Sequence, residues 1–155
     1  MNCSYNVEVD LERDLIRTVL AGFFTPADIV RFRQEWEAAH EHLRCDLNQH
    51  LSITDGVGMK IQSREAVEQF RALLSSSPYR SRRSAFVVPP TLTRSQISRV
   101  YAGFDARLGR REVKFFDSAE AAEAWLFDMP AGSAIAGRPG HSLASPAQPR
   151  VRARA

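Results

Sequence analysis

The stretch ITDGVGMKIQSREAVEQF, residues 53–70, begins with an apolar run, continues through two glycines and ends with an amphipathic segment. This pattern predicts a strand, a glycine loop and a helix. The loop matches neither phosphate-binding motif: a dinucleotide fingerprint needs a third glycine where Ile61 stands, and a P-loop needs a lysine directly after its last glycine. We therefore expect Gly56 and Gly58 to turn the backbone at positive φ rather than to bind a nucleotide.

Ser63 stands at the predicted start of the helix and has two interpretations. As an N-cap, its hydroxyl would stabilise the helix by about 1 kcal/mol. As a phosphorylation site, it would benefit from the free N–H groups and the dipole of the helix start, which favour negative charge. Lys60 and Arg64 would support a phosphate there. The residue types alone favour the cap and leave the second interpretation open.

Strand and helix patterns alternate on both sides of this stretch. Residues 5–9 and 15–23 predict an antiparallel hairpin, and Thr25-Pro26 is typical of a helix start. Such alternation after a hairpin predicts an α/β fold with a mixed sheet. The other predicted strands are 50–55, 85–88 and 113–116, and the other predicted helices begin at Ser63, at Thr93 and at Asp117 or Ser118.

Function in such sheets usually lies at the carboxyl ends of the parallel strands. Three segments follow predicted strand ends, namely Asp55 to Ser63, Pro89 to Arg94, and the turn after Phe116. We expect these three segments to lie near one edge of the sheet.

The last part of the chain differs from the rest in composition. Residues 129–155 are rich in Ala, Arg and Pro and show no periodicity, which predicts a disordered tail. The net charge of +3 depends on the arginines of this tail, so the preceding part is close to neutral. A near-neutral domain lacks the field that sequence-independent phosphate binding needs. We therefore expect no specific nucleic-acid partner.

The 155 residues are enough for one globular domain, and 44% of them are hydrophobic. The sequence contains no run of 18 apolar residues, so we expect no membrane span. The start, MNCSYNVEVDLERD, lacks the basic and apolar regions of a signal peptide, so a cytoplasmic location is expected. Cys3 and Cys45 are then expected to be reduced thiols.

The sequence offers no recognisable catalytic or metal-binding constellation. G-x-S-x-G does not occur, and no pair of carboxylates stands out as an acid–base pair. His42 and Cys45 are three residues apart, but no second pair completes a metal site. We expect a protein that is not an enzyme and that holds neither a metal nor a cofactor.

The chain resembles the STAS superfamily, in the branch often called SpoIIAA-like. The stretches that carry the resemblance are LAGFFTPADI, ITDGVGMKIQSREAV, AFVV and FFDSAEAAEAWL. It divides the chain into a SpoIIAA-like (STAS) domain at 1–128 and the tail at 129–155. It implies a four- or five-stranded mixed β-sheet with about four helices packed mainly on one face. It also implies a non-enzymatic regulatory module that binds a protein partner.

In anti-sigma-factor antagonists of this superfamily, a partner kinase phosphorylates a serine at the start of the second helix. The resemblance places Ser63 at that position. It implies a contact surface near Asp55, Lys60, Gln62 and Arg64, with the turn from Gln62 to Arg64 on the solvent side. This sequence differs from the family by having Gln62 before the serine, where an aspartate is usual.

The resemblance also supports an alternative function. Relatives in this branch have been likened to lipid-transfer domains of the CRAL-TRIO type, which implies a carrier or sensor of a small apolar, lipid-like ligand. The pocket would lie between the sheet and the helices, and its expected lining is Phe23, Phe24, Trp36 and Phe70.

Overall fold

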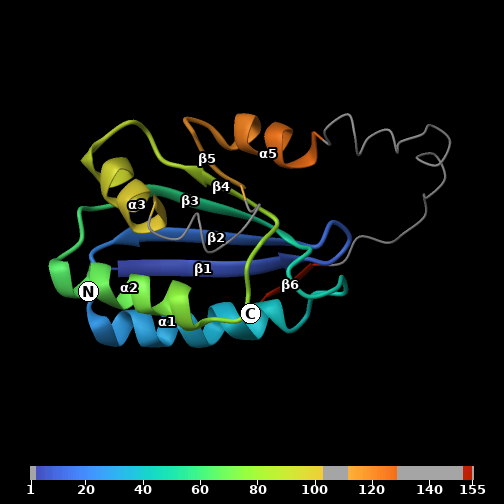
Figure 1. Cartoon of the computed structure of the whole chain (residues 1–155), viewed down its shortest axis with the longest axis horizontal. Helices are drawn as coiled ribbons and strands as arrows, with labels where there is room; N and C mark the ends of the chain where they lie inside the picture. Colours follow the sequence, from blue (N-terminus) through green and yellow to red (C-terminus); the bar gives the residue numbers. More distant parts are fainter. Residues whose placement is uncertain (1–2, 103–111, 129–151, 155) are drawn as a thin grey trace, which may run out of the picture.

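The computed structural model describes residues 3–102, 112–128 and 152–154, and its architecture is α/β (Figure 1). The strands form one mixed sheet in the order β5-β4-β3-β2-β1-β6. The predicted α/β class with a mixed sheet is therefore confirmed: five strands make up the body of the sheet, and the short β6 is added at its edge. The strands are β1 (Cys3–Asp10), β2 (Leu15–Gly22), β3 (Leu51–Met59), β4 (Arg83–Val87), β5 (Glu112–Phe116) and β6 (Arg152–Arg154).

The strand directions follow the predicted topology. β1 and β2 form the antiparallel hairpin, and β2, β3, β4 and β5 are parallel to one another. Their carboxyl ends therefore meet at one edge. The guanidinium of Arg94 lies 2.9 Å from Asp117, which joins two of the segments expected there.

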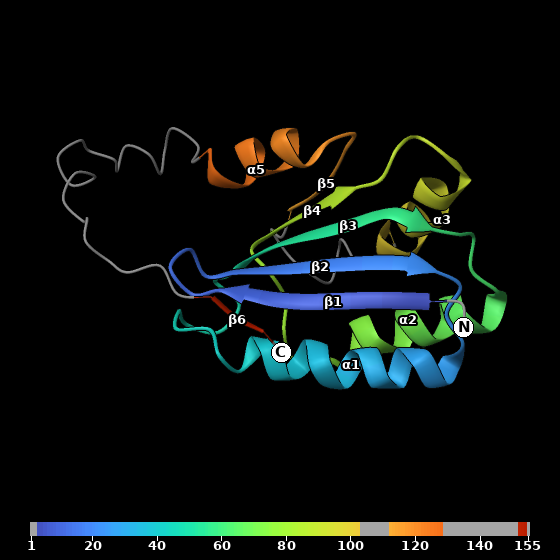
Figure 2. The ribbon, with the colours of Figure 1, turned by 180° about the vertical axis from the view of Figure 1, so that it is seen from behind.

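Helices cover both faces of this sheet, and most of them cover one face (Figure 2). α1 and α2 pack on a cluster that includes Ile16 of β2, whereas α5 packs on a cluster that includes the neighbouring Leu15. α3 lies on the side of α1 and α2, because its Tyr101 contacts the inward ring of Phe86. The described helices are α1 (Pro26–His40), α2 (Arg64–Ser76), α3 (Leu92–Ala102) and α5 (Ala119–Phe127).

Helix starts agree with their sequence signals. Thr25 caps α1 in a capping box with Asp28, and Pro26 is the first helical residue. Ser63 caps α2, and Ser118 rather than Asp117 caps α5. In each case the side-chain oxygen accepts a backbone N–H of the first turn, which a helix cannot satisfy internally.

The prediction of a glycine loop after Asp55 is wrong, because β3 continues through these residues to Met59. Neither Gly56 nor Gly58 has a positive φ. The glycines serve close approach instead: a Cβ on Gly58 would lie 2.9 Å from the Cβ of Ala21, where the register of β2 and β3 shifts. Pairing with β2 thus keeps the segment extended.

The predicted disordered tail lies mostly outside the described residues. At Arg152–Arg154 the structure has a strand instead, which pairs antiparallel with Glu8 to Asp10 of β1. β6 thereby covers part of a sheet edge that would otherwise expose unpaired backbone groups.

Candidate functional site

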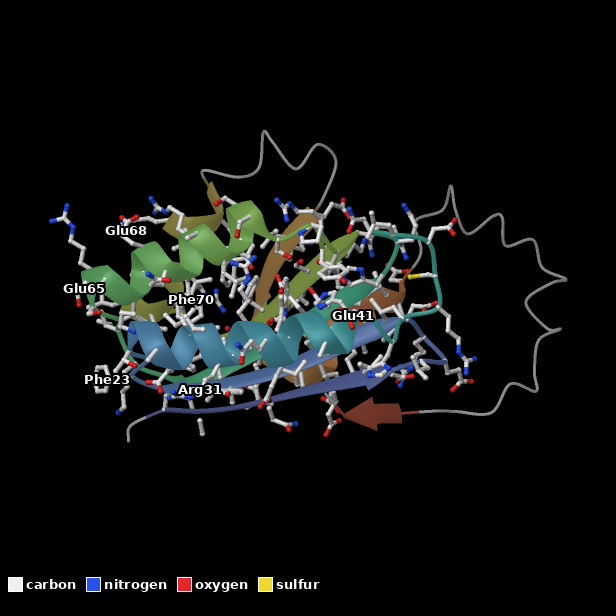
Figure 3. The ribbon with its side chains drawn as sticks, turned by 90° about the horizontal axis from the view of Figure 1, so that it is seen from below. Phe23, Arg31, Glu41, Glu65, Glu68 and Phe70 are labelled. Atoms are coloured by element: carbon white, nitrogen blue, oxygen red, sulfur yellow. The ribbon has the colours of Figure 1, made fainter. Side chains whose placement is uncertain are left out.

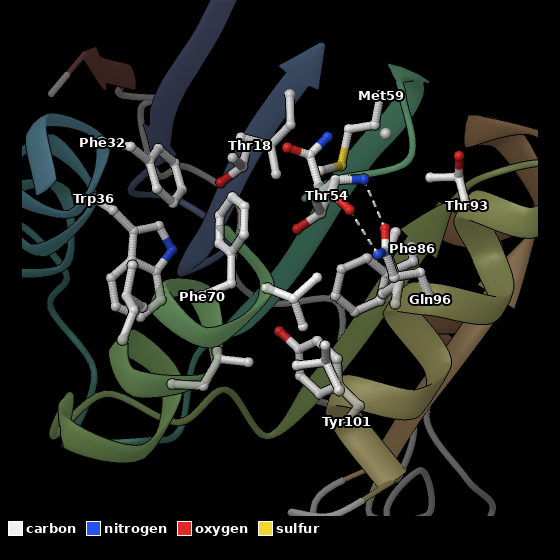
Figure 4. Close-up of a pocket in the computed structure, with 18 residues that line it drawn as sticks. Thr18, Phe32, Trp36, Thr54, Met59, Phe70, Phe86, Thr93, Gln96 and Tyr101 are labelled. Carbon is white, nitrogen blue, oxygen red and sulfur yellow. Dashed lines mark hydrogen bonds between the residues drawn. The ribbon is translucent and has the colours of Figure 1, made fainter. Parts of the chain in front are cut away.

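A cavity of about 110 Å³ lies between the sheet and helices α1, α2 and α3 (Figure 4). Its wall is mostly apolar, and none of the described residues that line it carries a charge. The lining residues are Phe32 and Trp36 of α1; Val67, Phe70, Leu73 and Leu74 of α2; Thr93, Gln96, Ile97, Val100 and Tyr101 of α3; Thr18, Leu20, Thr54, Gly56, Met59 and Phe86 of the sheet; and Gln62.

Aromatic rings close the cavity on the side of α1 and α2. Phe70 meets Phe24 edge-on, with ring centroids 5.5 Å apart, and it meets Phe32 at 6.4 Å. Tyr5 of β1 packs edge-on against Phe32 at 5.4 Å. This edge-to-face geometry is the favoured one for aromatic pairs and makes a firm wall.

Gln62 fixes the end of the cavity nearest the carboxyl ends of the strands. Its side-chain oxygen accepts the N–H of Phe24 at 2.9 Å, and its side-chain nitrogen donates to the carbonyls of Gly22 and Lys60. Its backbone exchanges two hydrogen bonds with the Gln96 side chain, at 2.9 and 3.0 Å, which ties α3 to the segment before α2. The expectation that Gln62 faces solvent is wrong, because it is only 7% exposed.

A second, more polar cavity of about 70 Å³ adjoins the first. The two share six lining residues, so they meet along a common wall that we call the junction: Thr18, Trp36, Thr54, Leu74, Phe86 and Tyr101. The rest of the second cavity is lined by His40, His50, Ser52, Tyr79, Arg80, Ser81, Ser84 and Val113.

His40 is buried in an aromatic cluster at the second cavity. Its ring stacks on Tyr79 at 4.6 Å and meets His50 at 4.8 Å. Burial lowers its pKa to about 4, although the Nδ1 contact with the carbonyl of Trp36, at 2.7 Å, acts in the opposite direction. His40 is therefore neutral near pH 7, and Nδ1 carries the proton because a carbonyl can only accept.

The other polar groups of the second cavity are mostly bound to the protein. The guanidinium of Arg80 donates to the carbonyls of Ser75, Ser77 and Tyr79, at the end of α2. The hydroxyls of Ser52, Ser81 and Ser84 hydrogen-bond to one another. The positive charge of Arg80 thus serves the helix end, where it stabilises carbonyl groups.

Two of the four predicted pocket residues line the cavity, and two do not. Trp36 and Phe70 do. Phe24 is 3% exposed and packs behind Phe70, whereas Phe23 is 51% exposed at the end of the sheet (Figure 3). Successive side chains of an extended segment point to opposite sides, so only one of these two phenylalanines can face the core.

Sequence reasoning missed the hydroxyl groups of the lining. Thr18 lies between Ile16 and Leu20 on the inward face of β2, and it is 4% exposed. A threonine at an inward position of an alternating strand was the available signal. Tyr101 of α3 also lines the cavity, and burial raises the pKa of its hydroxyl, which therefore stays protonated.

The residues predicted for a protein contact lie around the start of α2. Ser63 is exposed, and its hydroxyl accepts the N–H of Ala66 at 3.1 Å. Lys60 and Arg64 are exposed, and the half-buried Asp55 accepts the N–H of Val57 at 2.9 Å. The capping role of Ser63 is confirmed, and its phosphorylation stays a prediction.

Within the described ranges 3–102, 112–128 and 152–154, no three His, Cys, Asp or Glu side chains cluster as a metal site. The helices of these ranges are too short or too polar to cross a membrane. Comparison with protein-family models, curated proteins and solved structures finds no match to this chain.

Proposed function

We propose that the protein is a carrier or sensor that binds a small, mostly apolar molecule between its sheet and helices α1–α3. The observation that carries the proposal is the uncharged, aromatic-rich cavity of about 110 Å³ with its smaller neighbour of about 70 Å³. Protein interiors are close-packed, and voids larger than a water molecule are few. Apolar cavities of roughly 150 Å³ bind molecules of the size of benzene.

The wall of the cavity supports reversible binding. It presents rings and aliphatic chains from three helices, together with a few hydroxyl and amide groups. Ligand sites typically combine such an apolar lining with a small number of placed polar groups. Exclusion of water from the ligand surface would supply the affinity, at about 25 cal/mol per Å² of apolar area.

Trp36 provides a direct test, because it lines the cavity and is one of only two tryptophans. In a Trp125→Phe background, α-methylstyrene, a nine-carbon aromatic hydrocarbon, should change the Trp36 fluorescence saturably. Adding Val67→Phe should fill the cavity and abolish the change. The matched variant Val30→Phe, at an exposed position of α1, should leave it intact. A folded protein that shows no saturable change with this or smaller aromatic hydrocarbons contradicts the proposal.

A second candidate function is the binding of a protein partner at the carboxyl ends of β2 and β3. The exposed apolar side chains Phe23, Val57 and Ile61 gather there, beside Lys60 and Ser63, and contiguous exposed apolar groups mark contact surfaces. Cross-linking in cells of the native host should capture a partner that Phe23→Ser with Ile61→Ser loses. Leu47→Ser is the control, since Leu47 is 65% exposed at the opposite end of β3. Equal capture by both variants contradicts this candidate.

A further inference from the structure

We infer that the bound molecule is uncharged and carries one hydrogen-bond acceptor, of the ketone, ester or ether class, which it places at the junction between Trp36 and Tyr101. The inference rests on the proposed function and specifies the chemistry of its ligand. The junction is where the apolar and the polar cavity meet, so a molecule that occupies both must pass it.

Polar groups concentrate at this junction. Of its six residues, Thr18, Trp36, Thr54 and Tyr101 carry a polar side-chain atom. No hydrogen bond joins these four atoms to another of the described residues; Thr18 is 4% exposed, and the other three residues are half-buried. Ligand sites typically place a small number of polar groups in an apolar lining. These four groups at the junction therefore indicate a place for a polar group of the ligand.

The donors among them decide which group fits. The indole N–H of Trp36 can only donate, and the hydroxyl of Tyr101 keeps its proton because burial raises its pKa. The two rings come from α1 and α3, and their polar atoms lie on the sides that face each other across the cavity (Figure 4). The hydroxyls of Thr18 and Thr54 can rotate, so each can either donate or accept a hydrogen bond. Two donors that line the same junction favour a ligand with an acceptor.

A charged acceptor does not fit this site. The larger cavity has no charged lining residue among those described, His40 is neutral near pH 7, and the guanidinium of Arg80 is bound to backbone carbonyls. A carboxylate buried without a cation would pay a large desolvation cost. An uncharged oxygen pays far less and is satisfied by the two donors.

Acetophenone and α-methylstyrene form a matched pair of probes, because they have the same shape and differ by C=O against C=CH₂. Calorimetric titration of the full chain should give acetophenone the lower Kd, by about fivefold or more, the ratio expected for one or two net hydrogen bonds. Tyr101→Phe should remove most of this ratio and change the Kd of α-methylstyrene less than about twofold. Tyr5→Phe is the control and should leave the ratio unchanged, because Tyr5 lines neither cavity.

The outcomes separate the two proposals. If α-methylstyrene binds but acetophenone binds no more tightly, or if Tyr101→Phe leaves the ratio unchanged, the inference is wrong and the proposed function stands. Benzoate binding as tightly as acetophenone also overturns it. If neither probe nor a smaller aromatic hydrocarbon binds, the proposed function fails, and the inference fails with it. If circular dichroism shows that Tyr101→Phe does not fold, Trp36→Phe tests the other donor. It should reduce the ratio of the two Kd values in the same way.

Discussion

The two faces of the sheet are built from alternating residues of the same strands, yet they pack differently. On the face covered by α5, Ala85 and Val87 of β4 meet Ala122 and Leu126 with at most 3% exposure. On the opposite face, Phe86 borders two cavities. Aliphatic side chains fill the α5 side, whereas large rings and threonines line the two cavities on the other side. Close packing is thus complete on one face and leaves space on the other.

Two buried polar side chains, Arg83 and Thr18, show a contrast between the two faces. Arg83, which is 7% exposed beneath α5, pairs with Glu112 at 2.8 Å, donates to the carbonyl of Asp128 at 3.2 Å and lies over the ring of Trp125. The hydroxyl of Thr18 on the cavity side has no such protein partner among the described residues. Satisfied groups stabilise a fold, and unsatisfied groups that face a cavity are available to a ligand.

Truncating one leucine on each face tests the contrast in packing. Leu126→Ala should lower the free energy of unfolding by about 4 kcal/mol, because a fully buried side chain leaves a cavity that its neighbours cannot fill. Leu74→Ala should cost less than about 2 kcal/mol, since Leu74 already borders empty space. Urea denaturation measures both. Equal losses would mean that the two faces are packed alike.

His40 tests the buried polar cluster through pH. Its pKa in the folded protein is about 4, below the ordinary value of 6.5, so the unfolded chain binds a proton more readily. The contribution of neutral His40 to the free energy of unfolding is therefore complete above pH 6.5. It falls as the pH drops toward 4, by up to about 3 kcal/mol.

The measurement is urea denaturation at several pH values, with two variants compared. Other acids titrate in this range, so the difference between wild type and His40→Gln carries the result, and the exposed His42→Gln is the control. The pH slope should flatten in His40→Gln alone. Identical slopes in all three proteins would place the His40 ring in contact with water.

Local signals predicted much of this fold, and long-range contacts decided the rest. The strand–helix order and the caps at Thr25 and Ser63 follow from neighbours in the chain. The path of β3 through Gly58 does not, because pairing with β2 overrides a composition that is typical of a turn. The cavity depends on how far α3 stands from α2, which no local pattern encodes.

Gln62 is a second residue whose position depends on long-range contacts, and it gives the last test. A glutamine beside exposed Lys60 and Ser63 is expected to face solvent, yet it is buried by bonds to residues 38 and 34 positions away, Phe24 and Gln96. Gln62→Leu leaves the N–H of Phe24 and the carbonyl of Gly22 without this partner. It should lower the free energy of unfolding by about 2 kcal/mol. Ser63→Ala, the neighbouring control, should cost about 1 kcal/mol through the lost cap.

The tie between α3 and the segment before α2 joins the backbone of Gln62 to the side chain of Gln96, so Gln96→Leu is the variant that tests it beside the cavity. With α3 loosened, Gln96→Leu should weaken the binding of α-methylstyrene, whereas Ser63→Ala should leave it unchanged. Chemical denaturation and the Trp36 titration measure the two effects. A smaller loss of stability for Gln62→Leu than for Ser63→Ala would mean that the side-chain bonds of Gln62 add little to the fold. Unchanged binding by Gln96→Leu would mean that the cavity side is held open without this bridge, by its aromatic wall alone.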